Sequence, residues 1–191
     1  ATALVIGPGL AAAHLPSGLR EMALEWWDRA PMPVVADASA IDWLPGKAAG
    51  QGKVRVITPH PGEAGRVLGV SSQEIQTDRP KALRTLSQRY GGCQVVLKGY
   101  QTLVGAAEGP LHVNCSGTSS IAQGGSGDAL AGFLGGLLAQ PALQHEVGTP
   151  LRYGVWQHGA AGDRLTARQR GWTVEELVGV LSEVRPDEGV F

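Results

Sequence analysis

Apolar residues occur along this chain in short runs, and each run stops at a glycine, a proline or a charged residue. Runs of this kind, without polar alternation, are typical of strands in a parallel sheet that helices cover on both faces. Four such strands are expected, in segments ALVIGPG (3–9), PVVADA (33–38), VRVITPH (54–60) and QVVLKG (94–99). Segment QTLVGAAEGPLHVN (101–114) instead has two short alternating runs around a Glu-Gly-Pro turn, which predicts a β-hairpin.

Helical patterns lie between and after these strands. Segment 17–30 repeats apolar residues at helical spacing, which predicts one buried helix face formed by Leu19, Met22, Ala23, Trp26, Trp27 and Ala30. Further helices are expected in segments 79–90, 121–140, 153–165 and 173–184, and Thr173 and Glu176 form a capping box at the start of the last one. Since no repeat and no linker interrupts the alternation of strand and helix, the sequence predicts one α/β layered domain, which we expect to begin upstream of residue 1.

Composition narrows the partners that this chain is expected to have. The 191 residues carry a formal charge of −1 with no acidic or basic block, which argues against a nucleic-acid surface and a polybasic membrane patch. No apolar run approaches the ~20 residues that a membrane span needs. Cys93 and Cys115 have neither redox nor metal-ligand spacing, so a reduced protein in the cytoplasm is expected.

Polar and small residues follow each predicted strand. They are Gly7 to Ala11, Asp37, Thr58 to Glu63, Lys98 to Thr102 and Asn114. Because open parallel sheets bind ligands outside the carboxyl ends of their strands, these segments are expected to share one edge of the sheet. Each also has a structural interpretation: Asp37 as a helix cap, His60 as a loop histidine with its own hydrogen bonds, and Lys98 as a surface charge.

The stretch GGSGD (124–128) stands where a loop becomes a helix. Backbone N–H groups and the helix dipole attract anions at such a place, and Gly124, Gly125 and Gly127 carry no β-carbon that would keep a phosphate away. Asp128 suits a base that takes a proton from an attacking hydroxyl during phosphoryl transfer. The alternative is a glycine-rich packing turn. No Gly-Lys-Ser/Thr follows, so this is not a Walker A loop, and the glycines at 132, 135 and 136 indicate close helix-to-sheet packing instead.

Five motifs, in this order, resemble the ADP-dependent NAD(P)H-hydrate dehydratases: GPGL (7–10), TPHPGE (58–63), VVLKG (95–99), QGGSGDALAGFLGGLLAQ (123–140) and HGAAGD (158–163). The resemblance implies a ribokinase-like α/β fold, a three-layer sandwich with a mostly parallel central sheet. It makes residues 1–191 one dehydratase domain that is incomplete at its N-terminus, of a kind often fused to an NAD(P)H-hydrate epimerase. It also implies that ADP phosphorylates the hydroxyl of the (S)-hydrate, that phosphate then leaves, and that NADH or NADPH and AMP are formed.

The resemblance also implies the role of each site residue. Asp128 is the base and Gly127 belongs to the anion hole. The hydrated cofactor is assigned to Gly9, His60, Pro61, Gly62, Glu63, Arg66 and Asp128, where residues 60–66 are expected to form a loop. The nucleotide is assigned to Lys98, Gly99, Tyr100, Gln101, Thr102, Thr118, Gln123, Gly124, Gly125, Ser126 and Gly127. Mg²⁺ is expected to accompany the nucleotide without a protein ligand set, and the protein is expected to be a homo-oligomer, commonly a tetramer.

Departures from the family pattern leave two other functions open. Ala11 and Ser39 replace a family glycine and a common aspartate, and the family's first strands and helices do not occur in this sequence. A vitamin-precursor kinase of the same superfamily would also need Asp128 and an anion hole, but it would release a stable phosphate ester. A non-catalytic nucleotide-binding module would keep the fold without turnover. The segment expressed alone is expected to be poorly soluble or inactive, because one edge of its sheet would be unpaired.

Overall fold

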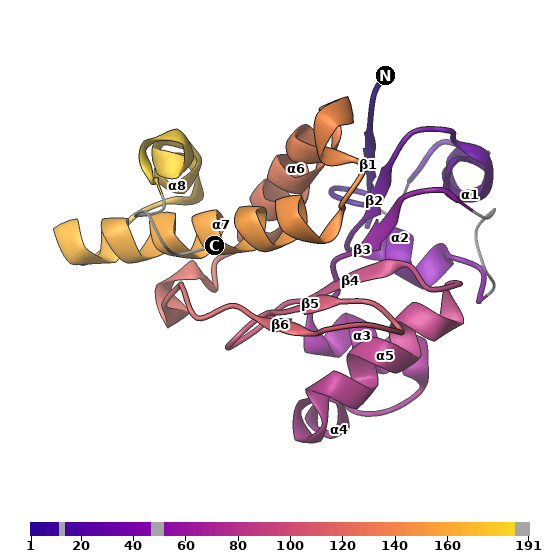
Figure 1. The fold of residues 1–191 in the computed structure, drawn as a ribbon, viewed down its shortest axis with the longest axis horizontal. Helices are drawn as coiled ribbons and strands as arrows, with labels where there is room; N and C mark the ends of the chain where they lie inside the picture. Colours follow the sequence, from indigo (N-terminus) through magenta and orange to yellow (C-terminus); the bar gives the residue numbers. More distant parts are fainter. Residues whose placement is uncertain (12–13, 47–51, 186–191) are drawn as a thin grey trace.

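A six-stranded mixed sheet forms the centre of the molecule (Figure 1). The computed structural model describes residues 1–11, 14–46 and 52–185. The strands lie side by side in chain order, and β1 to β4 are parallel while β5 and β6 each run antiparallel to the strand before. Their bounds are β1 Leu4–Ile6, β2 Val34–Ala36, β3 Arg55–Ile57, β4 Gln94–Leu97, β5 Leu103–Gly105 and β6 His112–Val113. The four predicted strands and the predicted hairpin are confirmed.

Helices cover both faces of this sheet, which confirms the three-layer sandwich (Figure 1). The helices are α1 Leu19–Arg29, α2 Ser39–Trp43, α3 Pro61–Leu68, α4 Ser72–Thr77, α5 Arg79–Arg89, α6 Ser126–Leu138, α7 Gly148–Arg168 and α8 Val174–Val180. Single 3₁₀ turns lie at Ser119–Ile121, Pro141–Leu143 and Leu181–Glu183. Helices α1 to α5 pack into one core with one face of the sheet, and α6 and α7 pack against the other face.

The two cores explain why the strands are apolar throughout. Val35, Val56 and Val96 lie in the core with α6 and α7, whereas the residues next to them in each strand lie in the core with α1 to α5. Successive side chains of a strand point to opposite faces, and here both faces are covered. Arg55 is the polar exception. Its buried guanidinium donates to Trp27 O, Ala30 O and Met32 O, the last carbonyls of α1 and of the turn that follows.

The predicted buried face of α1 is only partly correct. Ala23, Trp27 and Ala30 are buried, but Met22 is 39% exposed. Leu19 and Trp26 are half-buried and line a surface pocket. The helix therefore turns only its Ala23–Trp27 side to the sheet, because β1 is the last strand on this side in the part of the chain that the structure describes.

Helix α6 crosses β1 and β2, and its three inner glycines differ in environment. A β-carbon on Gly135 would lie 2.3 Å from Val5 Cγ2, so this glycine lets the helix approach the sheet as predicted. The same prediction is wrong for Gly132 and Gly136, which are exposed, and a β-carbon added to either would have no atom within 4 Å.

A small third core lies beside α7, near the C-terminal end of the described residues. Leu177 and Leu181 from the last helical segment pack there with Ala161, Leu165 and Trp172. The predicted capping box is confirmed, because Thr173 accepts from the N–H of Glu176 while Glu176 accepts from the N–H of Thr173.

Candidate functional site

The carboxyl ends of β1, β2, β3 and β4 meet beneath the first turn of α6, and they bring Gly7, Asp37, Thr58 and Lys98 together. Thr58 Oγ1 donates to Asp37 Oδ1 over 2.7 Å, and Lys98 Nζ donates to the same oxygen over 2.7 Å. Gly7 has a φ of +128°, and a β-carbon there would lie 1.8 Å from Asp37 O, so only glycine fits. The strand ends thus form one connected edge, as the sequence predicted.

The glycine-rich stretch GGSGD forms the start of α6. Gly125 is the N-cap with a φ of +88°, a conformation that glycine adopts without strain. Gly127 lies inside the helix, so here the reason for a glycine is space: a β-carbon would come within 3.1 Å of Lys98 Nζ. At Gly124 no atom lies within 4 Å of such a β-carbon. The turn therefore leaves its backbone open on one side and has an ammonium group beneath it.

Lys98 is a half-buried ion-pair partner, so its interpretation as a surface charge is wrong. Its side chain is 17% exposed and that of Asp37 is 2% exposed. Asp37 is also not a helix cap, because α2 begins after Ala38 without a side-chain cap hydrogen bond. The carboxylate instead joins the ends of three strands through Thr58 and Lys98.

Asp128 opens onto a pocket of about 410 Å³ between α6, α1 and the loop after β1. The pocket is lined by Asp128 and Gly132 of α6 together with Val5, Ile6, Gly7, Pro8, Leu10, Leu19 and Trp26. Gly9 lies in the same loop, exposed and with a φ of +76°. The geometry places an exposed carboxylate at the rim of a mostly apolar hollow, one residue beyond the glycine that covers Lys98.

Residues 61–66 form the first turns of α3, so the predicted loop is wrong there. His60 is the N-cap: its Nδ1 accepts from Gly62 N over 3.0 Å, and its N–H donates to Glu63 Oε2 over 2.8 Å. Pro61 suits the first helical position because its missing N–H would have no helical partner. Glu63 is buried in this cap, while the exposed Arg66 pairs with Asp42 over 3.0 Å.

The turn after β4 carries the predicted nucleotide residues Gly99 to Thr102. Tyr100 is 85% exposed, Gln101 has a φ of +54°, and Thr102 Oγ1 donates to Gly99 O. Arg79 of α5 fixes the beginning of this turn, since its guanidinium donates to Leu97 O and Lys98 O. Burial lowers the pKa of the Arg79 guanidinium from its ordinary value.

The segment from Asn114 to Gln123 is held against α7. A β-carbon on Gly159 would lie 2.2 Å from Ser116 Oγ, and the N–H of Gly117 donates to Asp163 Oδ2 over 2.8 Å. Thr118 Oγ1 lies 3.4 Å from Thr166 Oγ1, and Gln123 Nε2 donates to Ser120 O. The HGAAGD motif therefore supplies close packing and a carboxylate that hold this segment as it leads into GGSGD.

His158, the first residue of that motif, reaches the first turn of α6. Its Nε2 lies 3.1 Å from Ser126 O and 3.3 Å from Ser126 Oγ. The pKa of His158 is lowered to about 4, chiefly by burial and also by the nearby Lys98, while the hydrogen bond to Ser126 acts in the opposite direction. The imidazole is thus neutral near pH 7, and its Nε2–H donates to the Ser126 carbonyl.

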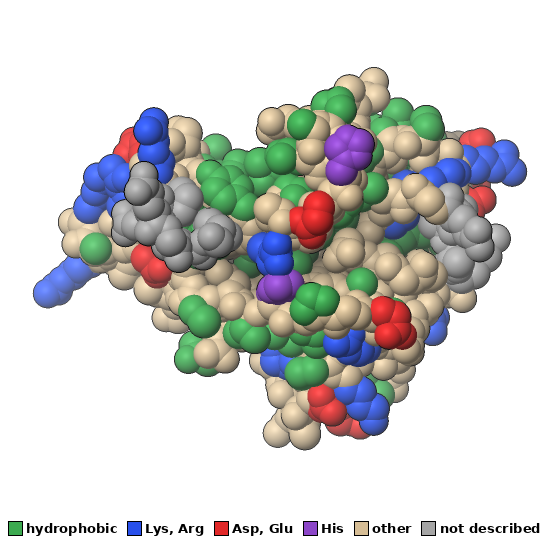
Figure 2. All heavy atoms as spheres, in the orientation of Figure 1, with side chains coloured by type: hydrophobic (Ala, Val, Ile, Leu, Met, Phe, Trp, Pro, Cys, Tyr) green, Lys and Arg blue, Asp and Glu red, His purple; other side chains and the backbone are tan. Residues whose placement is uncertain are grey.

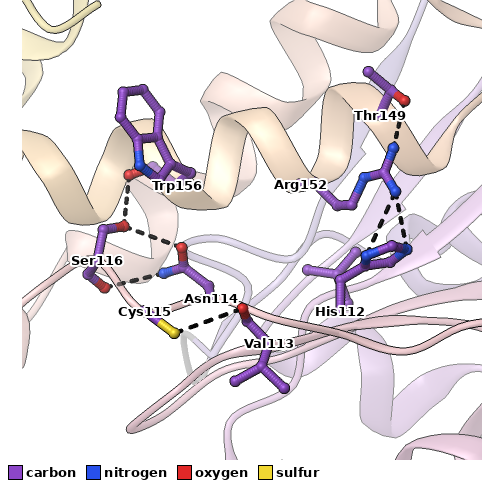
Figure 3. A pocket seen from close by; sticks show the side chains of 9 residues that line it. His112, Val113, Asn114, Cys115, Ser116, Thr149, Arg152 and Trp156 are labelled. Carbon is purple, nitrogen blue, oxygen red and sulfur yellow. Dashed lines mark hydrogen bonds between the residues drawn. The ribbon is translucent and has the colours of Figure 1, made fainter. Parts of the chain in front are cut away.

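A second and larger pocket, of about 830 Å³, lies between the β5–β6 hairpin and α7 (Figure 3). Its polar side chains are already engaged: Arg152 Nη1 lies 2.9 Å from His112 Nε2, and Asn114 and Ser116 hydrogen-bond each other. It contains none of the predicted site residues. Asn114, noted at its strand end, shapes the turn at Ser116.

The surface and the cysteines fit the composition. Figure 2 shows basic and acidic side chains mixed over the visible face. Among the described residues, no helix is long and apolar enough to cross a membrane, and no group of three or more His, Cys, Asp or Glu side chains could hold a metal ion.

Cys93 is buried and Cys115 exposed, and both are free thiols. Burial raises the pKa of the Cys93 thiol far above its usual range.

Sequence reasoning did not assign a site role to four residues that form this edge: Asp37, Thr58, Arg79 and His158. Asp37 and Thr58 had a signal, because each directly follows a predicted strand. Arg79 and His158 act from helices, and neither helix pattern shows which side chain turns toward the sheet edge.

Comparisons with known proteins show the family that this chain resembles. The family model described as NAD(P)H-hydrate dehydratase matches residues 1–180. The chain is 39% identical over 167 residues to the ADP-dependent (S)-NAD(P)H-hydrate dehydratase of Neisseria meningitidis, covering 84% of this chain and 54% of that protein. It is 39% identical over 189 residues to the bifunctional NAD(P)H-hydrate repair enzyme Nnr of Escherichia coli, covering 96% of this chain and 34% of that protein.

Solved structures give the same result for the fold. The ADP/ATP-dependent NAD(P)H-hydrate dehydratase of Bacillus subtilis, co-crystallised with ATP and Mg²⁺, superposes with a TM-score of 0.80 at 28% identity, over 95% of this chain and 63% of that one. A hydroxyethylthiazole kinase from Pyrococcus horikoshii superposes with a TM-score of 0.74 at 16% identity, over 97% of this chain and 73% of that one, which shows the shared ribokinase-like fold. The chain spans about a third to about two thirds of the length of most of these relatives. Because the family model matches residues 1–180 of the 191 residues, the chain belongs to the NAD(P)H-hydrate dehydratase family.

Proposed function

We propose that the protein containing this chain catalyses the ADP-dependent dehydration of (S)-NAD(P)H hydrate, a metabolite-repair reaction. The observation that carries the proposal is the arrangement at the start of α6. The ammonium of Lys98 lies beneath Gly127, the backbone at Gly124 is open, and Asp128 follows at the rim of an apolar pocket. Cation, backbone amides and carboxylate are the groups that phosphoryl transfer to a hydroxyl needs.

In this reaction Asp128 takes the proton from the hydroxyl of the hydrate. The hydroxyl oxygen then attacks the β-phosphorus of ADP, the bond to the AMP oxygen breaks, and AMP leaves. Backbone N–H groups of Gly125 to Gly127 and the ammonium of Lys98 hold the transferring phosphoryl oxygens. The new phosphate ester then loses phosphate together with a ring proton, and the double bond of NADH or NADPH is restored.

The pocket beside Asp128 is proposed to hold the hydrated nicotinamide ring. Its lining by Pro8, Leu10, Leu19 and Trp26 suits an uncharged, partly saturated ring. Gly9 lies in the loop beneath this pocket. We further assign His60 to Gly62 and Arg66 to the same substrate, with Glu63 acting through its cap on His60. The nucleotide is assigned to the turn Lys98 to Thr102 and to the segment from Thr118 to Gln123.

Mg²⁺ is proposed to arrive with ADP. The carboxylate of Asp128 opens onto this pocket, and it suits Mg²⁺ only when phosphate oxygens and water complete the shell of the ion. The ion would supply charge neutralisation for the nucleotide phosphates. A cytoplasmic location, a homo-oligomer such as a tetramer and a fused epimerase domain are proposed from the family alone.

The test is to incubate the purified polypeptide, as the cell makes it, with ADP, Mg²⁺ and hydrated NADH or NADPH. Return of the absorbance of the reduced nicotinamide, with AMP and phosphate formed in equal amounts, supports the proposal. A stable phosphate ester without return of absorbance would instead identify a kinase. Nucleotide binding without either product would identify a non-catalytic module.

A further inference from the structure

A buried carboxylate lies at the centre of the proposed site without an assigned role. Asp37 is 1% exposed, and its Oδ1 accepts from Lys98 Nζ and from Thr58 Oγ1, each over 2.7 Å. Removing a carboxylate from water is costly unless charge and hydrogen bonds compensate it. Both compensating groups come from neighbouring strand ends, so the arrangement is built into the edge of the sheet.

The main chain of Asp37 is fixed as well. Its N–H donates to Ile6 O over 2.9 Å, and its carbonyl lies where a β-carbon of Gly7 would otherwise be. The main chain of Asp37 cannot shift without displacing the loop after β1, and its buried carboxylate is held by Thr58 and Lys98. Asp37 therefore behaves as a rigid anchor, whereas a lysine has a flexible four-carbon stem.

The ion pair faces the first turn of α6. Measured from the β-carbon position at Gly127, Lys98 Nζ lies at 3.1 Å and Asp37 Oδ2 at 3.9 Å. An ammonium has three hydrogens, and Asp37 takes one of them, which leaves others for a phosphate beside Gly127. A lysine that is already held in this place loses less freedom when the phosphate binds.

We propose that Asp37 is a positioning residue that holds the ammonium of Lys98 beneath Gly127 for the transferring phosphoryl group. This inference rests on the proposed function of the site. Asp37 does not touch the substrate and acts only through Lys98, with Thr58 fixing the orientation of the shared carboxylate oxygen. Its negative charge opposes the binding of another anion, so its benefit lies in the placement of Lys98 during transfer and not in nucleotide affinity.

Two variants and their combination test this role. Asp37→Asn keeps the shape and the accepting oxygen but removes the charge that anchors Lys98. We expect kcat to fall about 10- to 100-fold while the Kd for ADP stays within about threefold, because lost repulsion offsets lost placement. Lys98→Met is expected to lower kcat by about 100-fold. In the double variant, kcat should match that of Lys98→Met within about threefold, since Asp37 has nothing left to position.

Additive losses in the double variant, or an unchanged kcat in Asp37→Asn, would overturn the inference. Thr58→Val provides a milder version: a smaller loss of kcat that also vanishes in the Lys98→Met background. The matched control is Glu183→Gln, which breaks the remote ion pair with Arg164 of 2.8 Å and should leave kcat unchanged.

A second readout does not depend on turnover. The side-chain ammonium of Lys98 should give a slowly exchanging ¹⁵N signal in the wild-type protein that broadens or disappears in Asp37→Asn. If the wild-type protein fails to dehydrate the hydrate, the proposed function fails, and the ammonium signal still tests the placement of Lys98. A signal that is the same in both proteins contradicts the inference even when the enzyme is active.

Discussion

The substitution Gly127→Ala adds one methyl group between the backbone of α6 and the ammonium of Lys98. The backbone of Gly127 is helical, so alanine can adopt its conformation, and the effect is one of space. The new β-carbon would lie 3.1 Å from Lys98 Nζ, whereas ordinary contacts begin near 3.4 Å. Lys98 or the first turn of α6 must therefore move by roughly 0.3 Å, a few tenths of an ångström.

The expected magnitude follows from that displacement. Lys98 is held by its 2.7 Å ion pair, so it cannot yield without lengthening the bond to Asp37. A misplacement of about 1 Å can cost about 100-fold in rate, and loss of one donor to a developing negative charge about 100- to 1000-fold. A shift of a third of that size, together with a methyl group beside the phosphate position, should lower kcat about tenfold or more. The free energy of unfolding should change little, because the preference for alanine over glycine in helices, about 1 kcal/mol, offsets the cost of the tight contact with Lys98.

The assay measures kcat with ADP and the hydrate, and the midpoint of urea unfolding. Gly136→Ala is the matched control on the same helix, exposed and with no atom within 4 Å of the added carbon. It should keep wild-type kcat and gain up to about 1 kcal/mol of stability. A kcat for Gly127→Ala within about twofold of wild type refutes the view that phosphoryl transfer uses the space between Gly127 and Lys98.

Three further predictions concern single residues. Asp128→Asn should retain ADP binding but lower kcat by about 100-fold or more, since general-base contributions have that size, and near-normal turnover removes Asp128 from the mechanism. Gly159→Ala should lower the free energy of unfolding by about 1–3 kcal/mol, because its β-carbon would lie 2.7 Å from the backbone carbonyl of Ser116; an unchanged urea midpoint contradicts this packing. His158 is neutral when folded, with a pKa of about 4, and takes up a proton at higher pH when unfolded, near 6.5. The free energy of unfolding is therefore unaffected by His158 above pH 6.5 and falls by up to about 3 kcal/mol as the pH falls toward 4. The variant His158→Gln should show a shallower pH dependence of this free energy in urea unfolding. Equal slopes for variant and wild type would contradict the assignment.

The pattern of apolar runs predicted the sheet because each strand is covered on both faces and needs no alternation. It missed α2, α3 and α4, which are short. Helices α2 and α3 begin directly after strand-end motifs, and α4 follows α3 after three residues. Residues 61–66 illustrate the reason. Pro61 and Gly62 indicate a turn, but His60 and Glu63 form a capping box that starts a helix at Pro61. Histidine is not one of the residues that commonly occupy the N-cap of a helix, so the motif gave little indication that a helix begins here.

The candidate site was predictable where chemistry and strand ends coincide. Lys98 and Gly127 were predicted separately, and the structure brings them close together, since a β-carbon on Gly127 would lie 3.1 Å from Lys98 Nζ. Asp37 stands at a predicted strand end, with a helix cap as its alternative interpretation, and a local pattern cannot show that its partners are Thr58 and Lys98, 21 and 61 residues away. Long-range pairing of this kind is decided by the order of strands in the sheet.

The same strand order explains why the site tolerates a buried charge. Parallel strands in sequential order place the residues after β2, β3 and β4 side by side, so one carboxylate can reach two donors without a long side chain. Helix α6 adds the positive end of its dipole above that carboxylate and ammonium pair. Below it, Gly7 closes against the backbone of Asp37, so the pair is enclosed on both sides. In the proposed reaction an incoming phosphate therefore meets a cation whose position is fixed by the sheet, and two glycines give room for close approach: Gly7 to Asp37 and Gly127 to Lys98.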